Sequence, residues 1–155
     1  MTHGIEGQMS DSAERLGILI VDDDRDQIFL SRRVVEKANM GFSVTTAAGG
    51  REAVAYLAQA CDGSCAIPAL IFLDIRMPEM DGFDVLRWIR AKEELAQVKV
   101  IILSTSDDPK DAKQAKELGA DGYLIKDPNP AVVASILRQV SAGRVWHPHK
   151  LSTSD

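Results

Sequence analysis

The chain has 155 residues, of which 18 are Lys or Arg and 23 are Asp or Glu, so its formal net charge is −5. A hydrophobic fraction of 45% is typical of a globular protein, because disordered chains contain fewer apolar residues. This length accommodates one domain around one hydrophobic core. The acidic balance disfavours direct nucleic-acid binding, which depends on clustered Lys and Arg.

Membrane association is also disfavoured. The longest apolar runs, such as 69–73 and 100–103, fall far short of the roughly 20 residues that cross a bilayer. Residues 1–17 lack the basic start and apolar stretch of a secretory signal, so we expect a cytoplasmic protein. Cys61 and Cys65 are too few for a zinc site and are interpreted as reduced, incidental thiols.

Strand-like and helix-like segments alternate along the chain. Three of the strand segments are almost continuous runs of Ile, Leu and Val, which is typical of parallel strands buried on both faces. The helical segments repeat apolar residues at helical spacing. In chain order the sequence predicts a strand over 17–22, a helix over 26–39, a strand over 42–47, a helix over 50–60, a strand over 69–74, a helix over 82–94, a strand over 99–104, a helix over 109–118, a strand over 121–126 and a helix over 130–142.

Capping residues support these boundaries. Asp81 is a predicted N-cap, and Asp108 and Asn129 each precede a proline that suits the first turn of a helix. Glycines that favour helix termination follow three of the segments: Gly41, Gly119 and Gly143.

Alternating strands and helices predict a three-layer α/β domain with a doubly wound, five-stranded parallel sheet. We assign residues 16–143 to this domain. Residues 1–15 are predicted to form a flexible N-terminal extension and residues 144–155 a C-terminal tail. Val145 and Trp146 are unusual in a solvated tail, so we expect them to dock on the domain or on a partner.

Acidic residues follow two of the predicted strands. Asp22, Asp23 and Asp24 follow the first strand, and Asp74 ends the third. The carboxyl ends of parallel strands meet at one edge of the sheet, where ligands bind. Several carboxylates there repel one another unless a hard cation such as Mg²⁺ lies among them. We therefore predict a magnesium site, and interpret Asp24 and the nearby Asp26 as turn and cap residues.

A hydroxyl group and an ammonium group end two other strands at the same edge. Ser104 ends the fourth strand and Lys126 the fifth. Together with Mg²⁺ they suit a tetrahedral dianion such as a phosphoryl group. An aspartate can attack phosphorus and form an acyl phosphate, and Asp74 is the candidate because its strand is predicted to be central. Thr105 is the alternative to Ser104 if the strand end is misplaced by one residue.

Four runs in this order carry a resemblance to a known family: ILIVDDD, LIFLDIRMPEMDG, VIILSTSDD and ADGYLIK. Spanning about residues 17–142, they resemble the receiver domain of bacterial two-component response regulators, of the stand-alone, single-domain type. The resemblance implies a flavodoxin-like fold with strand order 2-1-3-4-5. It implies signalling in a two-component system or phosphorelay.

The resemblance also implies roles for individual residues. Asp74 would be the phosphoacceptor. Asp23 and Asp74 would bind Mg²⁺ directly, with the backbone carbonyl of Arg76, and Asp22 would act mainly through a coordinated water.

Three further positions match the family's motifs. Ser104 falls at the switch hydroxyl and Lys126 at the family's lysine. Tyr123 falls at the aromatic switch, whose ring turns inward when the hydroxyl moves to the phosphoryl group. One departure is Asp127, which stands where the family usually has a proline, commonly with a cis bond, directly after the lysine. A cis bond before Asp127 would cost about 2.5–4 kcal/mol.

The function expected from the resemblance is that of a phosphoacceptor signalling protein, not an enzyme, which catalyses only its own phosphorylation and dephosphorylation. Its donor would be a sensor histidine kinase or a histidine phosphotransfer protein. With no output domain in the sequence, it would signal through protein contacts, and homodimerisation is a further hypothesis.

Two alternatives remain open. A Mg²⁺-dependent phosphatase of the haloacid-dehalogenase type would use Asp22 as nucleophile, but its usual Thr or Val after the Asp-x-Asp pair is missing, and no cap domain fits the length. A flavin-binding protein is the poorer alternative, because acidic side chains would repel the flavin phosphate.

Overall fold

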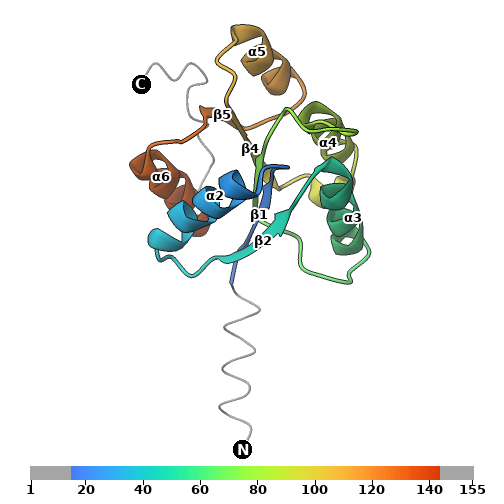
Figure 1. The fold of residues 1–155 in the computed structure, drawn as a ribbon. Coiled ribbons are helices and arrows are strands. Elements are labelled where there is room, and N and C mark those ends of the chain that lie inside the picture. The colour runs from blue at the N-terminus through green and yellow to red at the C-terminus, as the bar shows by residue number, and fades with distance from the viewer. Residues whose placement is uncertain (1–14, 144–155) are drawn as a thin grey trace, which may run out of the picture.

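The computed structural model describes residues 15–143 and places a five-stranded parallel sheet between two layers of helices (Figure 1). The strand order is β2-β1-β3-β4-β5, with every neighbouring pair parallel. This confirms the predicted fold class. The strands are β1 (Gly17–Val21), β2 (Ser43–Ala47), β3 (Leu70–Leu73), β4 (Lys99–Ser104) and β5 (Gly122–Ile125).

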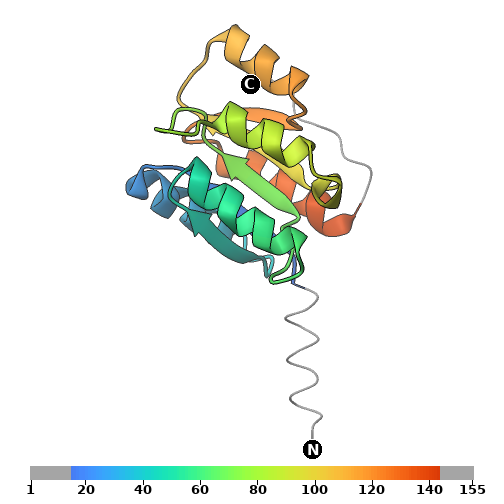
Figure 2. The ribbon, with the colours of Figure 1, turned by 90° about the vertical axis from the view of Figure 1, so that its right-hand side faces the viewer.

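The helices divide between the two faces of the sheet. Helices α2 and α6 lie on one face, whereas α3 and α4 cross the other, as Figure 2 shows. Helix α5 packs on the same side as α3 and α4 through the buried Ala115. The helices are α2 (Arg25–Lys37), α3 (Gly50–Cys61), α4 (Gly82–Arg90), α5 (Pro109–Glu117) and α6 (Pro130–Ala142), with a 3₁₀ turn η1 (Glu93–Leu95).

Alternate residues of each strand enter separate cores, as strand geometry requires. In β3, Ile71 and Leu73 join the cluster beneath α3 and α4, and Leu70 and Phe72 join the cluster beneath α2 and α6. All four side chains are buried. Burial on both faces explains why the strand sequences are continuous apolar runs.

The predicted helix over 82–94 is wrong at its C-terminal end, because α4 stops at Arg90. Residues 90–94 are mostly polar, whereas Leu95 is fully buried, so the chain must turn back toward the core. Arg90 closes this turn by donating to the carbonyl oxygens of Leu95 and Gly119 and by pairing with Asp121.

Helix α2 also ends earlier than predicted, at Lys37 instead of residue 39. Asn39 takes the left-handed conformation after the cap, with φ of 52°, so it ends the helix before Gly41. The other caps are confirmed, since Asp81, Asp108 and Asn129 each accept a hydrogen bond from a backbone N–H of the helix that follows.

Several smaller predictions concern side chains away from the strand ends. Cys61 and Cys65 are free thiols and half-buried. Trp88 packs against the core beneath α4, with the Lys92 ammonium 5.1 Å from its ring centroid. Met77 is buried in the same core.

Two predicted regions lie outside the described residues: the extension over 1–15, except for Arg15, and the tail over 144–155 with Val145 and Trp146. Within the described part of the chain, no helix combines the length and apolar composition of a membrane-spanning segment.

Candidate functional site

The charged residues predicted at the strand ends come together at the carboxyl edge of the sheet. Asp22 follows β1, Asp74 follows β3 and Lys126 follows β5. The Lys126 Nζ lies 2.6 Å from Asp22 Oδ2 and 3.3 Å from Asp74 Oδ1. Asp22 and Asp74 are buried, and Asp23 is exposed. The lysine therefore bridges two buried carboxylates from different strands.

Burial and charge shift the pKa values of this cluster. Burial, followed by the nearby charge of Asp22, raises the pKa of Asp74 from 3.8 to about 6, although Lys126 opposes the shift. Burial disfavours the ammonium of Lys126, but its contacts with Asp22 and Asp74 outweigh that effect and raise its pKa. Near neutral pH, Asp74 is mostly ionised yet binds a proton more tightly than an ordinary aspartate.

The backbone behind Asp74 is tightly packed. A Cβ atom at residue 82 would overlap the carbonyl oxygen of Asp74, so only glycine fits there. The Gly82 N–H also donates to the carbonyl oxygen of Ile75 at 2.8 Å. Asp81, the residue before Gly82, forms a capping box with Asp84 that fixes the start of α4. These contacts hold the segment after β3 in place.

The donor set fits a hard divalent cation. Asp22, Asp23 and Asp74 each offer a carboxylate oxygen, and the three oxygens lie within 4.8 Å of one another. Oxygen donors of this kind suit Mg²⁺, which also keeps several waters. The three acids predicted to bind magnesium are therefore brought together. Ligation by the backbone carbonyl of Arg76 stays a prediction.

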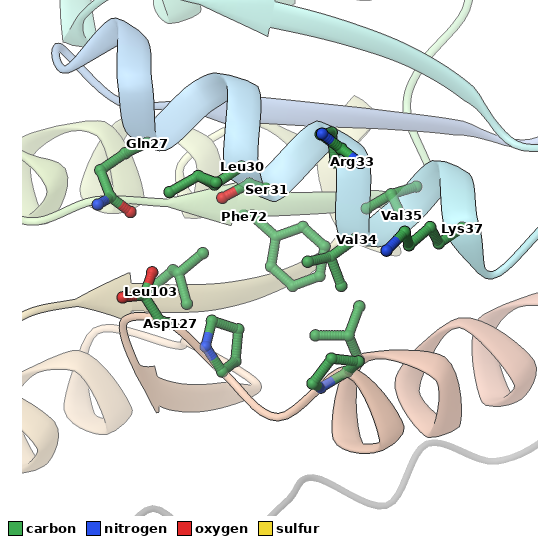
Figure 3. Close-up of a pocket in the computed structure, with 13 residues that line it drawn as sticks. Gln27, Leu30, Ser31, Arg33, Val34, Val35, Lys37, Phe72, Leu103 and Asp127 are labelled. Carbon is green, nitrogen blue, oxygen red and sulfur yellow. The ribbon is translucent and has the colours of Figure 1, made fainter.

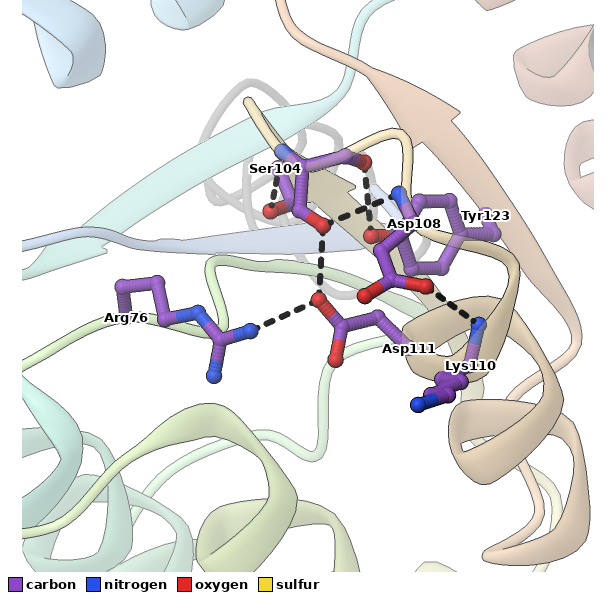
Figure 4. Close-up of polar contacts among 7 residues, drawn as sticks. Arg76, Ser104, Asp108, Lys110, Asp111 and Tyr123 are labelled. Carbon is purple, nitrogen blue, oxygen red and sulfur yellow. Dashed lines mark hydrogen bonds and ion pairs between the residues drawn. The ribbon is translucent and has the colours of Figure 1, made fainter.

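Ser104 and Tyr123 belong to a polar network beside the acid cluster (Figure 4). The fully buried Ser104 Oγ accepts from the Ser106 N–H at 3.1 Å, whereas Thr105 is exposed. The Tyr123 hydroxyl donates to the Ser106 carbonyl oxygen at 2.9 Å. The Tyr123 ring is only 1% exposed, so it already lies inward here, and burial raises the pKa of its hydroxyl.

Asp111 is a member of this network that the sequence analysis missed. Its Oδ2 accepts from Arg76 Nη2 at 2.7 Å and from Ser106 Oγ at 2.6 Å. Asp111 is buried on α5, four residues before the buried Ala115. A carboxylate at an apolar position of a helix was the signal that could have identified it, because a buried charge requires partners.

The departure at Asp127 does not keep Lys126 from the acid cluster. No peptide bond in residues 15–143 is cis, and the Lys126 N–H donates to the Ser104 carbonyl oxygen at 2.7 Å. Asp24 caps α2 by accepting from the Asp26 N–H at 2.9 Å, as predicted. Asp24 therefore caps a helix, whereas Asp22, Asp23 and Asp74 form the acid cluster.

An apolar groove of about 470 Å³ lies between α2 and the segment joining β5 to α6 (Figure 3). Phe72 and Leu103 form part of its lining, and Leu30 lies at its edge with an exposed side chain. Phe29, next to Leu30, is also exposed. Phe29 and Leu30 thus give α2, which begins directly after Asp22, Asp23 and Asp24, an exposed apolar surface.

Comparisons with known proteins agree with this fold. The chain is 33% identical over 138 residues to the transcriptional regulatory protein GltR of Pseudomonas aeruginosa, covering 86% of this chain but 54% of GltR. It therefore spans about half the length of that relative.

Two solved structures show a similar fold. The chemotaxis protein CheY4 of Vibrio cholerae is 30% identical, with a TM-score of 0.68, and the match covers 81% of this chain and 98% of CheY4. The Mn²⁺-bound form of response regulator Rcp1 is 26% identical, with a TM-score of 0.67, covering 82% of this chain and 92% of Rcp1. The family model of the response regulator receiver domain matches residues 18–138. The chain belongs to the response regulator receiver domain family.

Proposed function

We propose that the chain accepts a phosphoryl group on Asp74 and signals through protein contacts. The observation that carries the proposal is the position of Asp74, which is buried beside Lys126 and shares the acid cluster with Asp22 and Asp23. A carboxylate held next to a fixed ammonium is suited to attack a phosphoryl group, because the cation offsets the repulsion between nucleophile and phosphate.

Phosphoryl transfer to Asp74 exchanges one bond to phosphorus for another. A carboxylate oxygen of Asp74 forms a bond to the phosphorus of a phosphohistidine, and the bond between phosphorus and the imidazole nitrogen breaks. The electron pair of that bond stays on the imidazole nitrogen, which takes up a proton from solvent, and an acyl phosphate remains on Asp74. The final step is attack of water on phosphorus, which breaks the bond between phosphorus and the carboxylate oxygen, restores the carboxylate and releases inorganic phosphate.

Three groups are assigned to the phosphoryl oxygens. Lys126 supplies a charge-assisted donor, and the Ser104 hydroxyl supplies a second donor once it turns from the Ser106 N–H. We infer that Asp23 and Asp74 would hold Mg²⁺ directly with the backbone carbonyl of Arg76, and Asp22 mainly through a coordinated water; the ion would neutralise phosphate charge. Tyr123 is assigned as the residue that reports the movement of Ser104, because both contact Ser106.

The phosphoryl donor is assigned as a sensor histidine kinase or a histidine phosphotransfer protein. Because Asp74 is only 5% exposed, such a donor must approach the sheet edge closely. Phe29 and Leu30 offer exposed apolar surface on α2, which starts at that edge, so we assign α2 to donor contact. A cytoplasmic location and homodimerisation stay predictions.

The phosphatase alternative is not favoured. It would use Asp22 as nucleophile, whereas Asp22 makes the shorter contact with the Lys126 ammonium and accepts from the Asp24 N–H at 2.9 Å. A carboxylate engaged in both contacts is a weaker nucleophile than its neighbour. Asp74, whose pKa is raised to about 6, is a stronger base than an ordinary aspartate.

Intact-mass spectrometry tests the proposal. The protein is incubated with acetyl phosphate, with and without Mg²⁺, beside the Asp74→Asn and Asp24→Asn variants. We expect one Mg²⁺-dependent phosphoryl adduct in the wild type and in Asp24→Asn, the control in a capping acid, and none in Asp74→Asn. An adduct that persists in Asp74→Asn would refute the assignment.

A further inference from the structure

Helix α5 is tied to the segment that carries Asp74 by one ion pair. The Arg76 guanidinium, two residues after Asp74, donates to Asp111 Oδ2 at 2.7 Å across the edge of the sheet (Figure 4). The Asp111 side chain is 10% exposed and the Arg76 side chain is 62% exposed. The carboxylate is therefore fixed within the fold, while the guanidinium is free to exchange partners in solvent.

Ser106 is the second residue held by Asp111. Its hydroxyl donates to the same Oδ2 at 2.6 Å and accepts from the Asp108 N–H at 3.2 Å. Its own N–H donates to Ser104 Oγ, and its carbonyl oxygen accepts from Tyr123. One residue thus connects the hydroxyl at the end of β4, the buried tyrosine of β5 and the first turn of α5.

A phosphoryl group on Asp74 would compete for both partners of this connection. It replaces the single negative charge of the Asp74 carboxylate by about two and adds three acceptor oxygens two residues before Arg76, and a guanidinium binds such a group more strongly than a single carboxylate oxygen. The Ser104 hydroxyl, when drawn to the same group, leaves the Ser106 N–H. Asp111 thereby loses its contact with Arg76, and Ser106 loses its contact with Ser104.

We propose that Asp111 is a positioning residue that holds Arg76 and Ser106 in the unphosphorylated arrangement, and that phosphorylation of Asp74 breaks the Arg76–Asp111 contact and loosens the start of α5. The inference rests on the proposed function, because it requires a phosphoryl group on Asp74. Thermodynamic linkage makes this effect reciprocal. If phosphorylation weakens the Arg76–Asp111 contact, removal of that contact must make phosphorylation of Asp74 more favourable.

Backbone amide exchange of the full chain tests the proposal. The N–H groups of Ser106 and Asp108 both donate within the network, so their hydrogen exchange measured by NMR reports its opening. Exchange is compared before and after treatment with acetyl phosphate and Mg²⁺, and intact mass is recorded on the same samples. We expect phosphorylation to speed exchange at both amides about fivefold or more.

The Asp111→Asn variant separates the network from phosphorylation itself. It removes the charge that holds Arg76, so both amides should exchange as fast before phosphorylation as those of the phosphorylated wild type. Glu36→Gln is the matched control, because it breaks the exposed Arg32–Glu36 pair on α2 and should leave both amides unchanged.

Three outcomes would overturn the inference, and they are distinguishable. An adduct with unchanged exchange at both amides refutes the proposal about Asp111 and leaves the phosphoacceptor function intact. Wild-type exchange in unphosphorylated Asp111→Asn shows that the charge of Asp111 does not hold the network. Absence of any adduct in the wild type refutes the proposed function and the inference with it.

Discussion

Two cations contact carboxylates at the carboxyl edge of the sheet, and their side chains differ in exposure. Lys126 is 8% exposed and touches two buried aspartates, whereas Arg76 is 62% exposed and reaches one. A buried cation without partners is costly, so Lys126 is fixed, but a solvated guanidinium exchanges partners at little cost. The first contact suits the permanent site, and the second suits a reversible connection.

Removing the buried cation should have the largest effect on stability. Lys126→Met leaves Asp22 and Asp74 facing each other without compensation, so we expect the free energy of unfolding to fall by about 3 kcal/mol near neutral pH. Urea denaturation measures this loss. Lys113→Met, at an exposed position of α5, is the control and should stay close to wild type. A loss below about 1 kcal/mol for Lys126→Met would be typical of an exposed ion pair and would contradict this prediction.

The pKa of Asp74 predicts a specific pH dependence. Because this pKa is raised from 3.8 to about 6, the folded protein retains a proton that the unfolded chain has lost between these values. Stability therefore falls as pH rises through this window, and Asp74→Asn removes that fall. In metal-free buffer we expect the variant to be more stable by about 3 kcal/mol at pH 7.5, with the difference vanishing below about pH 3. A difference independent of pH would contradict the shift.

The permanent site also requires a rigid backbone behind Asp74. In Gly82→Ala, the added Cβ meets the Asp74 carbonyl group and lies 2.8 Å from Ile75 Cα, so we expect a loss of about 1–3 kcal/mol in thermal or urea unfolding. The control is Gly17→Ala, where the nearest atoms lie at 3.7 and 3.8 Å. Equal stability of the two variants would show that the loop after β3 yields easily.

Removing the exposed cation should have the smallest effect. Arg76→Gln deletes the pair with Asp111 but leaves the Ser106 hydrogen bond, so we expect the free energy of unfolding to fall by less than about 1 kcal/mol. Urea denaturation beside Lys126→Met gives the comparison directly. Equal losses in the two variants would remove the distinction between the fixed and the reversible contact.

The fold and the acid cluster were predictable because they depend on simple patterns. Continuous apolar runs identified the buried strands, and the residue after each run was placed at the edge of the sheet. Asp22, Asp74 and Lys126 meet there for that reason alone. The caps at Asp81 and Asn129 followed from local chemistry, which needs no tertiary information.

The sequence-based predictions were wrong or incomplete where tertiary contacts determine the structure. Helix α4 ends at Arg90 because the buried Leu95 turns the chain inward, which its polar neighbours do not reveal. Asp111 and Arg76 are 35 residues apart, so their pairing depends on how α5 lies against the loop after β3. The close approach of residue 82 to the Asp74 carbonyl likewise appears only in three dimensions.

The most direct test of Asp74 as phosphoacceptor is to locate the phosphoryl group in the phosphorylated protein. The protein is phosphorylated with acetyl phosphate and Mg²⁺, the acyl phosphate is reduced with borohydride to mark the modified residue, and peptides are sequenced by mass spectrometry. We expect the mark at Asp74 alone. A mark at Asp22 would instead support the phosphatase-type nucleophile and contradict the assignment of Asp74 as phosphoacceptor.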